Sequence, residues 1–411
     1  MAVGNAVRRA DGEARRGRLA VVVLFLANGF AYANIVPWLP VIKSHLELSN
    51  TQLGVGIGAM PLGALVTGIL AGPLIARFGS GRVAVGSGLA LACVLPLVAT
   101  APAWWVFALG MFCLGWTDAW MDSAMNAHGL RVQRRYGRTI INSFHGLWSV
   151  AAVAGGTVGT SMAGWGVPIA GHIAVVTAVL IAGVLAIARL LLPGPEVDEP
   201  TEPAAGADAP AGTAARVRRR LRVPGRSIGL LLVVSVLLMM AGAVEDSAAS
   251  WGAVFMRDEL AAPLFLVGLP FVACQGMMTL GRLTGDRLTD RFGAVAVART
   301  GGLLSAAGMS LALLTSEPVG AVAGFGLMGL GVATLFPLAL AAAGEIPGLG
   351  GGHGVALAAW LARMGFLGIP PLIGVIADAA SLTAGLWLIP VAGLLAAVLA
   401  SGLRPARGAD A

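Results

Sequence analysis

The feature that most constrains this chain is a succession of apolar stretches, each about 20 residues long, separated by short polar segments. A helix of that length crosses the hydrocarbon core of a bilayer, because each residue adds about 1.5 Å of rise. The stretches lack the alternation of β-barrel strands, which is the other way to satisfy a backbone in lipid. We therefore predict an all-α membrane protein with twelve spans, at 19–41, 52–75, 83–101, 104–127, 140–163, 168–192, 228–255, 264–285, 294–315, 319–343, 355–378 and 382–402.

Composition agrees with a membrane protein. Of the 411 residues, 57% are hydrophobic and 11% are charged, whereas soluble domains carry about 25% charge. The first apolar stretch is too long for a cleavable signal peptide. Cys93, Cys113 and Cys274 all fall within predicted spans, so we interpret them as packing residues and not as a disulfide framework. We expect no metal and no cofactor.

Arginines accumulate on one side of the predicted spans, in the segments 8–18, 77–82, 131–138, 216–226, 287–291 and 404–407. Because positive residues favour cytoplasmic loops, both termini are predicted to be cytoplasmic. The net charge of +7 is interpreted as contact with an anionic leaflet. Nucleic acid is not expected as a partner, since the arginines are spread over separate short loops.

One long polar segment interrupts the apolar pattern, at 193–226. It is rich in Pro, Ala and acids, ends in an arginine run, and cannot bury a core, so we predict a flexible cytoplasmic linker. The chain is thereby divided into a basic N-terminal tail at 1–18, a six-helix bundle at 19–192, the linker, a second six-helix bundle at 227–403 and a C-terminal tail at 404–411.

A short motif occurs once in each half. Residues 72–83 read GPLIARFGSGRV and residues 286–297 read DRLTDRFGAVAV, both between the second and third predicted helix of their half. A duplicated six-helix unit with a basic, glycine-bearing loop here resembles the major facilitator superfamily, whose signature is G-x-x-x-D-R/K-x-G-R/K-R/K. In this sequence Ala76 replaces the acid of the first copy. The resemblance implies a cytoplasmic gate motif that latches the inner face by ion pairs, at Gly72, Arg77, Gly79, Arg82, Asp286, Asp290, Arg291 and Gly293.

Two further stretches narrow this resemblance. DSAMNAHG at 122–129 and SFHGLWS at 143–149 look like a bacterial branch related to the fucose–proton symporters. Those symporters bear E-x-x-x-N-P on the fourth helix, and the acid accepts the coupling proton. Asp122 and Asn126 match the pair, with Ala127 in place of the proline. The resemblance implies proton-coupled transport of a sugar-like solute across a bacterial inner membrane.

The residues themselves support a role for these acids. At 100° per residue, Asp118, Asp122 and Asn126 share one helical stripe, and Trp116 and Trp120 face roughly the opposite way. An ionised carboxylate at membrane depth costs several kcal/mol, so it is expected to face water or a partner. A carboxyl group that is neutral when occluded and charged when wetted couples a proton gradient to a conformational change, which is the hypothesis for Asp122.

His145 lies at similar depth in the next predicted helix, with Asn142 and Ser149 on its stripe. We expect it to hydrogen-bond Asp122 and relay the proton. A purely structural hydrogen bond between the two helices is the alternative.

Other polar side chains within the spans are candidates for the same cavity. At least one of Glu245 and Asp246 is expected to point inward, Glu245 as a second proton-coupling candidate. Arg363 is interpreted as the only cation well inside the second half, and it needs either a protein carboxylate or an anionic substrate. The remaining substrate-cavity candidates, some of which could instead cap a carbonyl, are Asn28, Asn34, Trp148, Gln275 and Trp360.

We therefore predict a monomeric secondary active transporter that moves a small polar solute by alternating access, coupled to protons, with a sodium site left open. Efflux of a hydrophobic compound is the alternative, and a non-transporting sensor or scaffold is the alternative from another class. An intramembrane prenyltransferase that holds Mg²⁺ on two D-x-x-x-D pairs is disfavoured, because Arg287 and Arg291 are threaded through the second pair. We expect no enzymatic activity.

Overall fold

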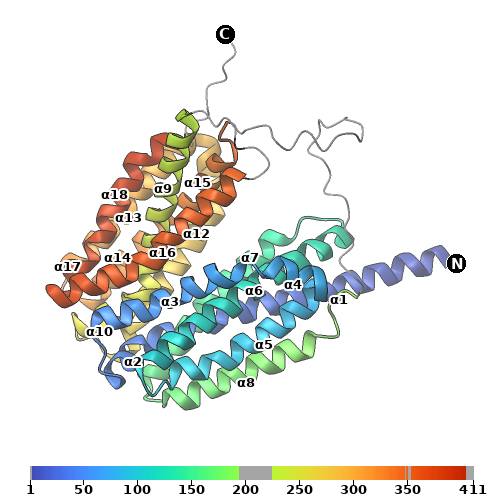
Figure 1. The fold of residues 1–411 in the computed structure, drawn as a ribbon, viewed down its shortest axis with the longest axis horizontal. Helices are drawn as coiled ribbons and strands as arrows, with labels where there is room; N and C mark the ends of the chain where they lie inside the picture. Colours follow the sequence, from blue (N-terminus) through green and yellow to red (C-terminus); the bar gives the residue numbers. More distant parts are fainter. Residues whose placement is uncertain (1, 194–224, 348, 350–352, 404–411) are drawn as a thin grey trace, which may run out of the picture.

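The computed structural model describes residues 2–193, 225–347, 349 and 353–403 (Figure 1). Every regular element within these ranges is a helix. The predicted C-terminal tail and nearly all of the predicted linker lie outside the described residues. The predicted N-terminal tail belongs to α1, which begins at Ala2.

Two helical bundles make up the molecule. The first contains α1 (Ala2–Ala33), η1 (Val36–Trp38), α2 (Leu39–His45), α3 (Asn50–Gly68), α4 (Ala71–Phe78), α5 (Ser80–Ala99), α6 (Trp104–Tyr136), α7 (Ile141–Gly164) and α8 (Ile169–Ile187). The second contains α9 (Gly225–Ser250), α10 (Gly252–Asp258), α11 (Leu264–Val267), α12 (Leu269–Phe292), α13 (Ala294–Leu314), α14 (Pro318–Val332), α15 (Leu335–Gly344), α16 (His353–Ala379), α17 (Leu382–Leu386), α18 (Leu388–Leu399) and η2 (Ala400–Leu403).

Within the described residues, nine helical segments are long and apolar enough to cross a membrane. The bent pair α3 and α4, which meet at 53°, makes a tenth if it is counted as one span. Helices α6 and α7 are not among these segments, although they contain 33 and 24 residues. Helix α6 is less apolar because it carries Asp118, Asp122 and Asn126, and α7 because it is rich in Gly, Ser and Thr. The chain is therefore a multi-pass helical membrane protein.

The repeated Arg-Phe-Gly motif forms the same turn in both bundles. Gly79 joins α4 to α5 at φ 85° and ψ 145°, and Gly293 joins α12 to α13 at φ 82° and ψ 152°. Glycine adopts a positive φ without the penalty that a Cβ imposes. In each copy the arginine guanidinium lies 5.3 Å from the ring centroid of the following phenylalanine. The sequence repeat is thus also a repeat of backbone geometry.

The bundles meet at one end and diverge toward the other (Figure 1). We call the end that carries α2 and α10 the closed end, and the end that carries the two Arg-Phe-Gly turns the arginine end. Near the closed end α3 packs against α16 and α7 against α12. A Cβ added at Gly58 of α3 would lie 3.1 Å from the carbonyl oxygen of Leu367 in α16. Small residues permit this close approach of helices from different halves.

Candidate functional site

A cavity of about 880 Å³ lies between the two bundles. Its size falls within the roughly 300–1,000 Å³ typical of small-ligand sites. The first half contributes α1, α6 and α7, and the second contributes α9, α12, α15 and α16. The cavity is lined by Asn28, Asp118, Asp122, Met125, Asn142, His145, Gly146, Trp148, Ser149, Glu245, Thr279, Arg282, Leu283, Asp286, Phe336 and Phe366. Since Asp286 lies near the end of α12, the cavity extends toward the arginine end.

One chain of hydrogen bonds on the first-half wall joins three helices. The Trp148 indole N–H donates to Asn28 Oδ1 at 2.7 Å, and Asn28 Nδ2 donates to Asp118 Oδ1 at 2.7 Å. Trp148 comes from α7, Asn28 from α1 and Asp118 from α6. The indole has only one donor, so it fixes the amide orientation, and the amide then presents its N–H to the carboxylate. Asp118 is therefore held by a neutral partner and not by an ion pair.

A second chain starts at Asp122, one turn along α6. Asn126 Nδ2 donates to Asp122 Oδ1 at 3.0 Å and to its backbone oxygen at 2.9 Å, and His145 Nε2 lies 3.1 Å from Asn126 Oδ1. The prediction of a direct hydrogen bond between His145 and Asp122 is wrong, because the Asn126 amide lies between the two side chains. In this arrangement His145 Nε2 carries the proton and donates to the amide oxygen.

The opposite face of α6 agrees with the predicted stripe. Trp116 and Trp120 do not line the central cavity but a separate groove outside it. Their rings meet edge to face with centroids 5.1 Å apart, and the Trp120 indole N–H donates to the Thr67 carbonyl at 2.9 Å. The helix therefore presents its acids to the cavity and its tryptophans away from it.

The second-half wall contains an ion pair that the sequence analysis missed. Arg282 of α12 lies 3.3 Å and 3.5 Å from the two carboxylate oxygens of Glu245 in α9. The interpretation of Arg363 as the only cation well inside the second half is therefore wrong. Asp286, predicted as a gate residue, lines the cavity one turn after Arg282. The i, i+4 spacing of these two charges on one helix face is the signal that could have identified Arg282.

Several predicted cavity residues lie elsewhere. Asn34 donates to the Phe30 carbonyl at 2.7 Å, and its Oδ1 lies 3.2 Å from His172 Nε2 in a buried contact. Gln275 is only 6% exposed and Trp360 is 48% exposed, and neither lines the cavity. Asp246 accepts the Ser250 hydroxyl at 3.0 Å and does not line the cavity either.

Arg363 of α16 is also absent from the cavity lining. Within the described ranges it makes no hydrogen bond and no ion pair. Of the predicted substrate-cavity set, Asn28 and Trp148 line the cavity, and Asn126 lies behind it as the link between Asp122 and His145.

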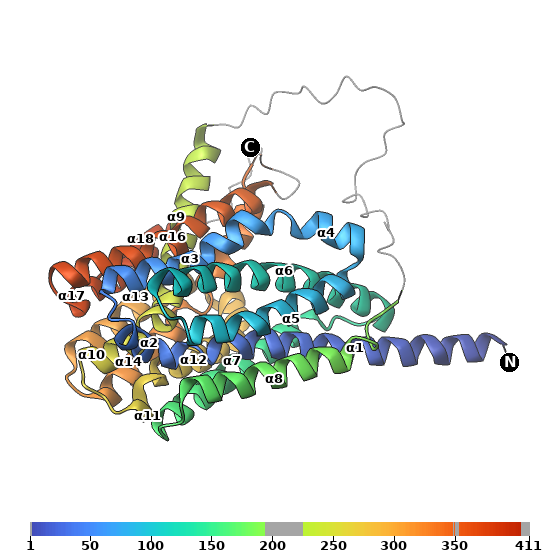
Figure 2. The same cartoon turned by 60° about the horizontal axis from the view of Figure 1, so that its bottom comes forward.

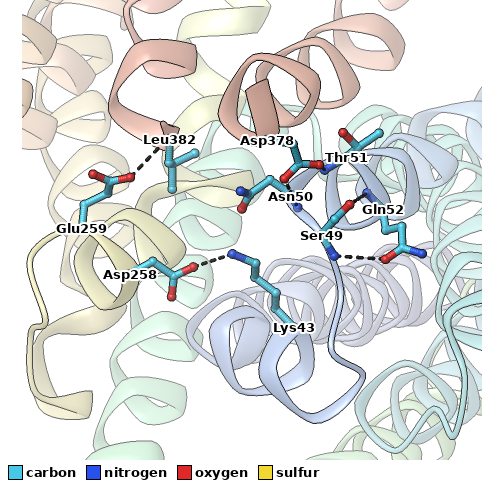
Figure 3. A network of polar contacts seen from close by, with 9 residues as sticks. All are labelled: Lys43, Ser49, Asn50, Thr51, Gln52, Asp258, Glu259, Asp378 and Leu382. Atoms are coloured by element: carbon cyan, nitrogen blue, oxygen red, sulfur yellow. Dashed lines mark hydrogen bonds and ion pairs between the residues drawn. The ribbon is translucent and has the colours of Figure 1, made fainter. Parts of the chain in front are cut away.

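Polar contacts join the two halves at the closed end (Figure 3). Lys43 of α2 pairs with Asp258 of α10, with Nζ and Oδ2 2.5 Å apart. Asp378, at the end of α16, accepts the backbone N–H groups of Asn50 and Thr51 at 2.8 Å each. These N–H groups belong to the first turn of α3 and have no acceptor within that helix. The carboxylate from one half therefore caps a helix of the other half.

Fold and cavity together define a class, that of helical membrane proteins with a solute-sized cavity between two similar bundles. The family model of the Major Facilitator Superfamily matches residues 21–287, and the chain belongs to this superfamily. It is 29% identical to the uncharacterized transporter y4wD of Sinorhizobium fredii, over 92% of this chain and 96% of that protein. It is also 29% identical to membrane protein MosC of Rhizobium meliloti, over 92% of this chain and 88% of that protein.

Two kinds of solved structure share the fold. The nucleoside transporter NupG is 14% identical, with a TM-score of 0.70, over 94% of this chain and 98% of that one. An inward-facing bacterial homologue of the human lysosomal transporter Spinster is 13% identical, with a TM-score of 0.69, over 96% and 99% of the two chains. The predicted superfamily is thereby confirmed, and the chain is a secondary transporter of a small solute.

Proposed function

We propose that the protein is a proton-coupled transporter of a small polar solute, in a bacterial inner membrane. The observation that carries the proposal is the central cavity, whose walls combine two first-half carboxylates with polar and charged groups of the second half. A polar wall matches a hydroxyl-rich or amide-bearing solute, because such a solute satisfies groups that an apolar ligand would leave unpaired.

A topology of twelve spans with both termini in the cytoplasm follows if α6 and α7 also cross the membrane. Their polar residues Asp118, Asp122 and His145 line the cavity and need no contact with lipid. Counting these two helices and the bent pair with the nine apolar segments gives the predicted number. The arginine end would then face the cytoplasm, and the cavity would be open to that side.

Asp122 is the proposed coupling group. We infer that the ionised carboxylate attracts Arg363 of the other bundle, a cation that makes no ion pair among the described residues. Uptake of a proton removes this attraction between the halves, and it also removes the charge that would be costly to occlude. The Asn126 amide connects Asp122 to His145, which faces the same cavity and provides a second protonatable group.

The test is transport into proteoliposomes with an imposed pH gradient. Ligands are first selected by their effect on the thermal stability of the purified protein, from panels of monosaccharides and of nucleosides, the latter because NupG is a nucleoside transporter. The selected solute is then followed with wild type, Asp122→Asn and the titratable control Asp122→Glu. We expect the asparagine variant to equilibrate the solute without accumulating it. Accumulation equal to that of wild type would remove Asp122 from the coupling mechanism.

Efflux of a hydrophobic compound is the second candidate, and the aromatic side chains Trp148, Phe336 and Phe366 in the cavity wall favour it. The same vesicles decide between the two. A fluorescent hydrophobic dye should be indifferent to the pH gradient if the solute is polar. Gradient-dependent dye movement, with no response to sugars or nucleosides, would instead support efflux.

A further inference from the structure

A second cavity, of about 950 Å³, lies at the arginine end of the first bundle. It is bounded by α4, α5, α6 and the end of α8, and its wall contains four arginines, Arg77, Arg82, Arg131 and Arg189. No acidic side chain is among its lining residues, all of which are described. Ala76, the position at which the superfamily motif has an acid, is part of this wall. The cavity is therefore strongly cationic.

An apolar groove of about 350 Å³ continues from this cavity along the outside of the bundle. The two spaces share Phe78, Arg82 and Gly86. Helix α4 meets α3 at 53°, and Figure 2 shows α4 extending over α6 and α5. Its deeper walls include Trp116 and Trp120. The cationic cavity is therefore continuous with an apolar groove on the outer surface of the bundle.

We propose that this double site binds one anionic phospholipid, with the phosphate among the arginines and one acyl chain in the groove. Arg77, Arg82 and Arg189 make no hydrogen bond or ion pair with the described residues, so their guanidinium groups are available to donate hydrogen bonds to a phosphate. The planar guanidinium matches phosphate oxygens in a bidentate manner. Basic pockets between helices on the cytoplasmic side suit anionic headgroups. The acyl chain stays out of water in the apolar groove, as it does in the bilayer, so its hydrophobic burial is kept.

The equivalent place in the second bundle lacks these properties. A cavity of about 580 Å³ follows the Gly293 turn, but it is lined by one arginine, Arg299, and one acid, Glu345. Its charges balance, so it has no excess attraction for an anion. The site is therefore specific to the first half, and the second half supplies a matched control.

The experiment uses the full chain, purified in detergent, stripped of lipid and titrated with single lipids under native mass spectrometry. Wild type should bind one phosphatidylglycerol at least tenfold more tightly than phosphatidylcholine. The variant R77Q/R82Q should weaken phosphatidylglycerol binding roughly 30-fold, as expected for the loss of two arginines near an anionic headgroup. The control R291Q/R299Q removes the same charge from the second half and should leave binding unchanged. Equal losses in both variants would reduce the effect to net charge and overturn the proposal.

Gly86→Leu tests the groove independently of charge. A Cβ at Gly86 would meet no atom within 4 Å, so leucine projects into the shared space without disturbing the protein. It should weaken phosphatidylglycerol binding at least fivefold, whereas Gly171→Leu, at an equally open position of α8, should not. Inorganic phosphate should not displace the lipid. If phosphate displaced the lipid and Gly86→Leu had no effect, the ligand would be a free anion. Equal binding of phosphatidylglycerol and phosphatidylcholine by wild type would also overturn the lipid assignment.

Discussion

The two halves of the molecule place carboxylates in the same cavity but hold them differently. Asp118 and Asp122 of the first half accept hydrogen bonds from the neutral amides of Asn28 and Asn126. Glu245 of the second half is paired with the Arg282 guanidinium. An acid with a neutral partner can take up a proton and keep its neighbour satisfied, whereas protonation of Glu245 would break an ion pair. If transport is coupled to protons, as proposed, we therefore expect the coupling acid in the first half.

The largest expected effect comes from neutralising the charged side chains of one cavity wall at a time. The double variant D118N/D122N should lower gradient-driven accumulation of the solute by about 100-fold or more, because no acid remains on the first-half wall of the cavity to exchange a proton. The double variant E245Q/R282Q should slow transport but keep its dependence on the pH gradient. Accumulation ratios measured at several imposed gradients check both. If only E245Q/R282Q loses the dependence, the coupling acid is in the second half.

The turn glycines should instead respond alike. Gly79→Ala and Gly293→Ala each force a Cβ into a backbone region that is almost exclusive to glycine. Each should cost about 1–3 kcal/mol, seen as similar falls in the thermal unfolding temperature in detergent. Gly72→Ala, at a helical position with open space around it, is the control and should be nearly neutral. A large difference between the two turn variants would show that their surroundings, and not the shared backbone, set the cost.

A smaller effect is expected for breaking the ion pair of the second half. Glu245→Gln leaves Arg282 without its anion, and E245Q/R282Q removes both charges. The single variant should be less stable than the double variant by about 1 kcal/mol, a modest value because both side chains are partly exposed. Thermal unfolding at equal ionic strength compares them. Equal stability of the two variants would mean that the pair contributes nothing to the second-half wall.

The smallest effects concern the closed end, to which each half contributes one partner. Asp378→Asn weakens two charge-assisted hydrogen bonds to α3 and should shift the equilibrium toward opening of this end by roughly fivefold. Lys43→Met removes a single, partly exposed ion pair and should shift it by about twofold. Distances between spin labels on α2 and α10 report the population. A larger shift for Lys43→Met than for Asp378→Asn would reverse the assigned importance of the two contacts.

Much of the architecture could be predicted because it depends on local patterns. Helical periodicity was enough to separate Asp118 and Asp122 from Trp116 and Trp120, and the Arg-Phe-Gly repeat was enough to indicate two related turns. The positions of His145 and Asp122 along their helices predicted a similar depth in the membrane, and hence that the two residues lie close together. They could not reveal that Asn126 lies between them, because rotation of one helix against another is fixed by packing and not by sequence spacing.

The missed residues have a common physical reason. Arg282 lies near the end of a predicted span, where a cation is ordinarily solvated, so its pairing with Glu245 depends on how α9 packs against α12. Asn34 looked like a cavity residue, but a buried polar side chain also occurs within packed helices when it finds a local acceptor, here the Phe30 carbonyl. Gln275 also looked like a cavity residue, but packing of its helix leaves it only 6% exposed. The cap formed by Asp378 on α3 joins residues more than 300 positions apart and leaves no local signal.

Helix α16 extends from the central cavity to the closed end. Phe366 on it lines the central cavity, and Asp378 near its last turn accepts hydrogen bonds from the start of α3. Between these points Pro370 and Pro371 lie within the helix and lack the N–H groups that would stiffen it. The helix can therefore bend between the cavity and the closed end, and we expect a bend at the two prolines to transmit movement from one to the other.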